Sequence, residues 1–141
     1  MHRPPSSQAW LALHEKASTR GEDALSEPEQ IWWDTQGWID TVKEGGLIHF
    51  YTGPRADRHD ETLFALAQLR AFEILGILET IAGLFGGDVP YEADARTAII
   101  NAWAEGSDAS NLMRSVDSVL LPLIPELARS LHIYVIQHGL G

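Results

Sequence analysis

At 141 residues, with 45% apolar residues and five tryptophans, the chain has the size and composition of one folded domain around a single core. It contains no cysteine, which excludes disulfides and thiolate metal sites and argues against a small secreted domain. Twenty acidic against ten basic side chains give a net charge of −10, which disfavours nucleic acid and anionic membranes as direct partners and favours a basic partner.

Residues 1–24 are predicted to form an N-terminal segment with a short helix, ahead of a helical core over 25–141. The segment begins MHRPPSSQAWLALHEKASTR and reaches His14, Glu15 and Lys16 after only a few apolar residues. That stretch is too short for a signal-peptide core or a membrane span, so a cytoplasmic location is expected. Glycine and proline punctuate helical periods along the chain, which predicts an all-α, single-domain bundle of about five to seven helices.

The clearest helix start lies at Ser26, which forms a capping box with Glu29 and has Pro28 in the first turn. Gly45-Gly46 predicts the end of this helix, which therefore covers 27–44. One stripe of this helix is apolar and is expected to face the core. It consists of Ile31, Thr35, Trp38 and Val42, flanked by Trp32 and Ile39.

The opposite face of the same helix is acidic. It carries Glu29, Asp40 and Glu44. Trp33 falls among these carboxylates, and an exposed tryptophan in an acidic patch is typical of a binding surface. The same ring can instead pack beneath the N-terminal segment, around Trp10 and Leu13. Both arrangements are open, with packing slightly ahead.

The stretch from Glu61 to Phe85 fits either one long helix, capped by Asp60, or two helices. One apolar row consists of Leu63, Ala67, Ile74, Leu78, Ile81 and Phe85. Arg70 interrupts this row, and Leu66, Leu69 and Phe72 form a second one. The interruption favours two helices that meet near Arg70 to Phe72.

Asp88 and Pro90 predict a helix over 91–105. Its buried residues are expected to be Ala95, Ile99, Ala102 and Trp103. A short helical turn through Val116 and Leu120 is then expected to end at Pro122. Across the predicted helices, one contiguous core is expected to contain Ile31, Trp38, Val42, Leu78, Ile81, Phe85, Trp103 and Leu131.

The last predicted helix begins at Pro125 and is apolar on two sides. One row is Leu127, Leu131 and Tyr134, and the other is Ile133 and Ile136. Two apolar sides predict either burial inside the monomer, which is favoured, or cover by a second subunit.

Known catalytic motifs are missing from the sequence. It has no GxSxG nucleophile elbow, no glycine-rich phosphate loop and no HExxH metalloprotease helix. Neither an enzymatic activity nor a cofactor is therefore predicted.

One loop does gather residues of the type that bind metal ions. It holds Asp57, His59 and Asp60, with His49 nearby. If these side chains converge on one point, the protein becomes a candidate metal-dependent hydrolase. In the favoured interpretation, Asp60 and Asp57 cap the following helix, Arg55 and Arg58 pair locally, and His59 is solvated. No metal site is therefore predicted.

Several sequence motifs occur in a recognisable order from residue 25 onward. They are LSEPEQ, then WIDTVKEGGLIHFY with Gly45, Gly46, Phe50 and Tyr51, then ETLFALAQL, EILGILETIAGLFG, and Asp117 before a last helix that ends IYVIQHG. In this order they resemble the DNA-mimic-protein-nineteen-like family of small bacterial proteins. Two places differ from the family pattern: Lys43-Glu44 replaces asparagines, and a usual glycine is missing near Ala71.

The resemblance implies an all-helical fold and, as for the characterised member, a homodimer whose carboxylates imitate DNA phosphates and occupy a transcription regulator. Rigidly held carboxylates can compete for a surface whose arginines and lysines are spaced for DNA. The predicted function is a non-enzymatic protein-interaction domain, in its sharpest form a DNA mimic that sequesters a basic nucleic-acid-binding protein. An immunity or antitoxin-type protein that neutralises a basic toxin needs the same acidity. On charge alone, the favoured interpretation is that the acidity only keeps the protein soluble. The predicted partner-binding residues are Glu22, Asp23, Glu27, Glu29, Trp33, Asp34, Asp40 and Glu44.

Overall fold

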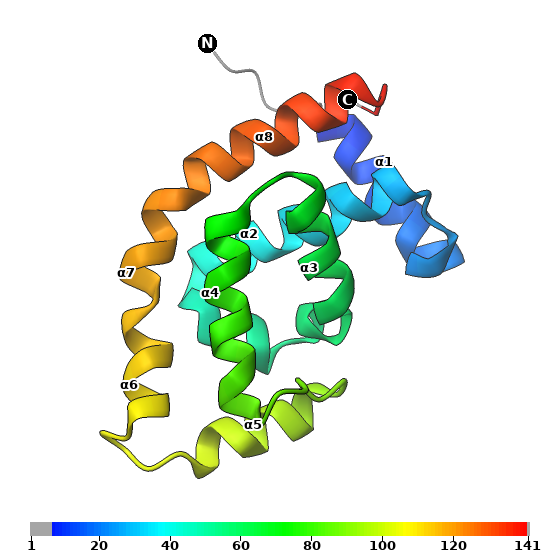
Figure 1. Cartoon of the computed structure of the whole chain (residues 1–141). Coiled ribbons are helices and arrows are strands. Elements are labelled where there is room, and N and C mark those ends of the chain that lie inside the picture. The colour runs from blue at the N-terminus through cyan, green and yellow to red at the C-terminus, as the bar shows by residue number, and fades with distance from the viewer. Residues whose placement is uncertain (1–6, 141) are drawn as a thin grey trace.

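A computed structural model describes residues 7–140 of the chain, and the fold is all-α, as predicted (Figure 1). The structure is 83% helical and contains no strand in the described part of the chain. The helices are α1 (Ser7–Arg20), α2 (Glu27–Thr52), α3 (His59–Gln68), α4 (Phe72–Ala82), α5 (Ala93–Ala102), α6 (Asp108–Ser115), α7 (Asp117–Leu120) and α8 (Ile124–Gln137).

Helix α2 is the centre of the bundle and contacts α3, α5, α6, α7 and α8. Figure 1 shows α3 and α4 side by side across α2, while α6, α7 and α8 follow one another as a bent arc along one side. The predicted core is largely confirmed, because seven of its eight residues are buried in one cluster and Trp103 packs against it partly buried.

The start of α2 is the predicted capping box, but its predicted end is wrong. Ser26 Oγ accepts a hydrogen bond from the Glu29 N–H at 3.3 Å, and Glu29 Oε1 accepts one from the Ser26 N–H at 2.8 Å. At Gly46, φ is 81° and the helix kinks without ending. Asp117 Oδ1 accepts a hydrogen bond from the Leu47 N–H at 2.9 Å, so a carboxylate from α7 caps the turn after the kink.

The two-helix arrangement predicted for 61–85 is confirmed. Helix α3 ends before Arg70, whose φ of 58° is left-handed, and α4 starts at Phe72. The predicted role of Asp60 as a helix cap is wrong, because α3 already begins at His59 and Asp60 lies in its first turn. The residue at the cap position is Arg58, and its side chain makes no capping hydrogen bond.

Helix α5 is rotated relative to the prediction. Ala95 and Ala102 are exposed, whereas Arg96 and Ile100 are buried. The physical reason is Arg96, whose guanidinium donates to backbone carbonyls in two segments of the chain, 51–53 and 90–91, and to the Asp57 carboxylate at 2.7 Å. A fully satisfied arginine can be buried, and here it turns the helix inward.

The end of the chain also differs from the prediction. Pro122 does not end the helical path, because it lies in a 3-10 turn that joins α7 to α8. Leu127 and Leu131 are buried as expected, but Ile133 and Ile136 are 44% and 52% exposed. The expectation that both apolar sides of α8 are buried within the monomer is therefore wrong.

By length and composition alone, one run in the described part of the chain, Asp108–Gln137, is apolar enough to cross a membrane. In this structure the run is α6 to α8, and it contains Pro122 and Pro125. Its inner side, which includes Leu120 and Val135, packs into the core of the bundle, and 28% of its most apolar stretch is buried.

Candidate functional site

A groove of about 210 Å³ lies between α2 and α3. Its lining residues are Glu27, Gln30, Ile31, Asp34, Asp60, Glu61 and Phe64. Four of the seven are carboxylates, and neither lysine nor arginine is among them. Glu27, Asp60 and Glu61 are exposed, and the Phe64 ring is 48% exposed. An exposed aromatic ring among carboxylates is suited to a cationic side chain, because the ring face and the carboxylates both attract positive charge.

Asp34 is the buried wall of this groove. It is 3% exposed, and Arg58 donates to its two carboxylate oxygens, from Nε at 2.7 Å and from Nη2 at 3.1 Å. Burial raises the pKa of Asp34, and the hydrogen bonds from Arg58 oppose that rise. The expectation that Asp34 presents a free charge to a partner is wrong, because the fold neutralises it internally.

Trp33 is buried, so its predicted exposure as a partner-binding residue is wrong and the alternative of packing under the N-terminal segment is confirmed. Its ring centroid lies 5.7 Å from that of Trp10 and 4.7 Å from that of His14. The Arg55 guanidinium covers the ring at 4.2 Å, and Trp33 Nε1–H donates to Glu22 Oε2 at 2.6 Å. Trp33 therefore joins α1 to α2, and Arg55 does not pair locally as predicted.

Lysine and arginine residues neutralise several of the predicted partner-binding carboxylates. Lys16 Nζ donates to Glu29 Oε1 at 2.7 Å. Burial alone would raise the pKa of Glu29, but the hydrogen bonds from Lys16 and Ser26 outweigh burial and hold this pKa below its usual value. Arg58 lies 3.8 Å from Glu22 and 3.9 Å from Asp23, in addition to its bonds with Asp34. Local pairing of Arg58 was therefore also wrongly predicted.

The remaining predicted residues are exposed and have no ion pair with lysine or arginine in the described structure. Glu27 lines the groove, Asp40 accepts a hydrogen bond from Gln36, and Glu44 lies 3.8 Å from His49. The acidic surface without basic neighbours is therefore smaller than predicted, and part of it lies against α3.

The loop that was considered for metal binding is used by the fold. Asp57 bonds to Arg96, and His59 is 7% exposed with its Nε2 3.1 Å from the Tyr51 hydroxyl. Burial lowers the pKa of His59, and the prediction that it is solvated is wrong. No group of three or more His, Asp or Glu residues within 7–140 is placed to hold a metal ion, so the geometric requirement of the hydrolase alternative is not met.

Sequence reasoning missed four groove residues, namely Gln30, Asp60, Glu61 and Phe64, and assigned a fifth, Ile31, to the core alone. Asp60 was assigned to capping, and Phe64 lay outside the apolar row assigned to that helix. A signal was nevertheless present, because residues three or four apart on a helix are neighbours, and Phe64 follows Glu61 by three positions and Asp60 by four. An aromatic residue one turn after two carboxylates marks the surface that the groove uses.

Fold and site together define a class: a helical bundle with an acidic groove that holds an exposed aromatic ring. Comparisons with protein-family models, with curated proteins and with solved structures find no match to the chain. The resemblance to the DNA-mimic-protein-nineteen-like family therefore stays a prediction from the sequence motifs.

Proposed function

We propose that the chain is a non-enzymatic, cytoplasmic protein-interaction domain that binds an arginine-bearing segment of a basic partner in the groove between α2 and α3. The observation that carries this proposal is the lining of the groove. Three exposed carboxylates and a half-exposed phenylalanine stand together there, and the lining includes no lysine or arginine. The charge of −10 attracts the same partner from a distance.

Arginine suits this groove better than lysine does. Its planar guanidinium stacks on an aromatic face while its N–H groups reach carboxylates at the edge of the ring. Phe64 offers the face, and Glu61 and Asp60 belong to the same turn of α3. The groove carboxylates are solvent-exposed, so each of them contributes only a little binding free energy. The affinity therefore depends on the carboxylates and the Phe64 ring acting together.

The partner in the sharpest form of this proposal is a DNA-binding regulator, whose arginines are arranged for phosphates. That choice rests on the motif resemblance, while the groove itself supports any basic protein, a toxin included. A pull-down with the full chain as bait, eluted by rising salt, identifies the partner. Its binding should weaken steeply with salt, because exposed charges are screened over about 8 Å at physiological ionic strength.

A direct test of the groove uses the full chain and a blocked tetrapeptide, Arg-Ala-Ala-Arg, followed by amide NMR shifts. Saturable shifts are expected around Glu27, Glu61 and Phe64. Phe64→Ala should weaken binding about two- to fivefold, the amount expected for an exposed cation–π contact. Phe72→Ala, which removes another exposed phenylalanine outside the groove, is the matched control and should leave the affinity unchanged. Shifts scattered over all acidic surfaces would contradict the proposal.

A further inference from the structure

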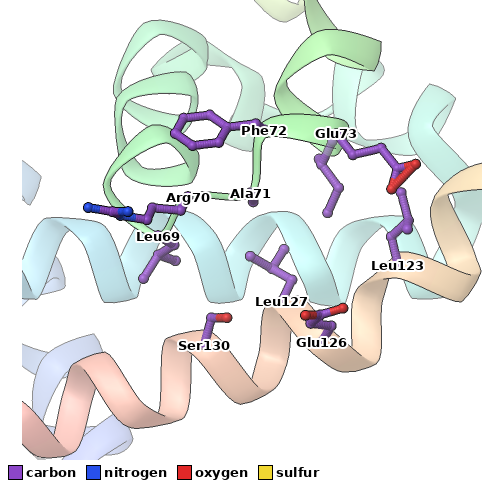
Figure 2. Close-up of a pocket in the computed structure, with 10 residues that line it drawn as sticks. Leu69, Arg70, Ala71, Phe72, Glu73, Leu123, Glu126, Leu127 and Ser130 are labelled. Atoms are coloured by element: carbon purple, nitrogen blue, oxygen red, sulfur yellow. The ribbon is translucent and has the colours of Figure 1, made fainter.

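A second cavity lies away from the acidic groove, between the α3–α4 turn and the start of α8 (Figure 2). Its volume is about 180 Å³, and its apolar floor includes Leu69, Ile74 and Leu127, all of which are buried. Phe72 stands at its edge with 62% of its side chain exposed. Drug-sized ligands use cavities of about 300 Å³ or more, so this cavity has room for one large apolar side chain.

The turn that forms one wall of the cavity holds an arginine in a backbone conformation that favours glycine. The Ala71 N–H bonds to the Leu66 carbonyl at 2.9 Å, and the Arg70 N–H bonds to the Ala67 carbonyl at 3.0 Å. These two bonds end α3 in a Schellman motif, with Arg70 at the position where glycine is usual. Its φ of 58° is strained for a residue with a Cβ, so arginine does not stabilise the backbone at this position.

Three charged side chains surround the cavity: Arg70, Glu73 and Glu126. All three are exposed, and none makes a side-chain hydrogen bond or ion pair within the described structure. In Figure 2, Arg70 extends at one end of the cavity, and the carboxylates of Glu73 on α4 and Glu126 on α8 lie toward the other end. The cavity is therefore apolar in the middle, positive at one end and negative at the other.

We propose that this cavity is a second docking site, for a protein segment that inserts one leucine- or phenylalanine-sized side chain between Phe72 and Leu127. The segment carries an acidic residue toward Arg70 and a basic residue toward Glu73 and Glu126. Charge complementarity selects this occupant, because a purely basic segment leaves Arg70 repelled and a purely acidic one is repelled by both glutamates. The volume limits the anchor to a single side chain.

The probes for this site are two blocked pentapeptides, Glu-Ala-Phe-Ala-Lys and its reverse order, Lys-Ala-Phe-Ala-Glu. With the full chain, one of the two orders should give saturable amide NMR shifts confined to 69–74 and 123–130. Replacing the phenylalanine of the peptide by serine should remove the shifts. The Phe72→Ala variant should weaken binding about tenfold or more, as for a central aromatic contact. Leu11→Ala, which removes an exposed apolar side chain of α1 outside both sites, is the control and should leave this affinity unchanged.

Arg70→Gly separates docking from folding, because glycine fits the left-handed turn. This variant should keep or raise the melting temperature, yet bind the pentapeptide about two- to fivefold more weakly. A peptide with glutamine in place of its glutamate should bind both proteins equally. Absence of saturation below about 10 mM in both orders, or a loss of binding that does not depend on the glutamate, would overturn the proposal. The same shifts on concentrating the protein alone would overturn it too, since they would assign the surface to self-association.

Discussion

The carboxylates around α2 are of two kinds. Toward α1, Glu29 is paired with Lys16, and at the buried wall of the groove Asp34 is paired with Arg58. At the exposed rim of the groove, Glu27 of α2 and Glu61 of α3 have no ion pair with lysine or arginine in the described structure. Carboxylates of the first kind stabilise the fold, whereas those of the second kind are available to another molecule. Net charge alone does not distinguish the two, because both contribute equally to the total of −10.

The largest effect is expected when the cation is removed from the buried Asp34–Arg58 pair. Arg58→Ala leaves Asp34 buried at 3% exposure without its bidentate partner. We expect a loss of about 3 kcal/mol or more in the free energy of unfolding, because an uncompensated buried charge is costly. Glu61→Gln, in the groove, should change stability by less than about 0.5 kcal/mol. Urea denaturation of both variants measures the difference, and similar losses in both would remove the distinction.

Asp117 is a third carboxylate that stabilises the fold, and its replacement should lower the free energy of unfolding by a smaller amount. It caps the turn of α2 that follows the kink at Gly46. Asp117→Ala should destabilise the protein by about 1 kcal/mol, the usual value of a helix cap, and Asp117→Asn should recover most of it because the amide oxygen still accepts the bond. Thermal unfolding measures both. Equal losses for alanine and asparagine would show that the capping hydrogen bond is not the source.

Arginines divide in the same way as carboxylates. Arg58 and Arg96 are bonded within the fold, whereas Arg70 is exposed in a left-handed turn. Arg70→Gly should therefore stabilise the chain by up to about 1 kcal/mol, since it relieves the strain of a Cβ at positive φ. A drop in melting temperature for this variant would indicate a contact of the Arg70 side chain that stabilises the fold.

Buried His59 should make the stability of the fold depend on pH. Burial places the pKa of His59 below 6.5, so the unfolded chain binds the proton more readily than the folded chain does. Stability should therefore fall as pH drops below about 6.5, until the folded-state pKa is passed. His59→Gln should flatten this part of the profile, and His49→Gln, an exposed control, should retain it. A profile unchanged by His59→Gln would contradict the assignment.

Local signals predicted much of the fold. The capping box at Ser26 and the break at Arg70 both depend on residues within a few positions of one another. The continuation of α2 past Gly46 escaped prediction because Asp117, which caps the turn after the kink, lies 70 residues beyond Leu47. The rotation of α5 escaped for the same kind of reason, since three of the bonds of buried Arg96 reach residues 39 to 45 positions away.

The candidate site was only partly predictable, because exposure depends on partners distant in sequence. The Lys16–Glu29 pair is separated by 13 positions, and the Arg58–Asp34 pair by 24. A helical projection places these carboxylates on a face but does not show which of them a cation covers. The groove also needs α3 beside α2, and that neighbourhood is decided by tertiary packing.

In the proposed function, the position of the groove carboxylates, and not the total charge of the protein, determines where a cationic segment binds. The most direct test compares Glu61→Gln with Glu79→Gln, an exposed glutamate on α4 outside the groove, since both variants change the net charge equally. Titration with the Arg-Ala-Ala-Arg peptide at low salt should show about a two- to fivefold loss of affinity for Glu61→Gln and no loss for Glu79→Gln. Equal losses for both variants would mean that only the total charge matters, and they would contradict a binding site in the groove.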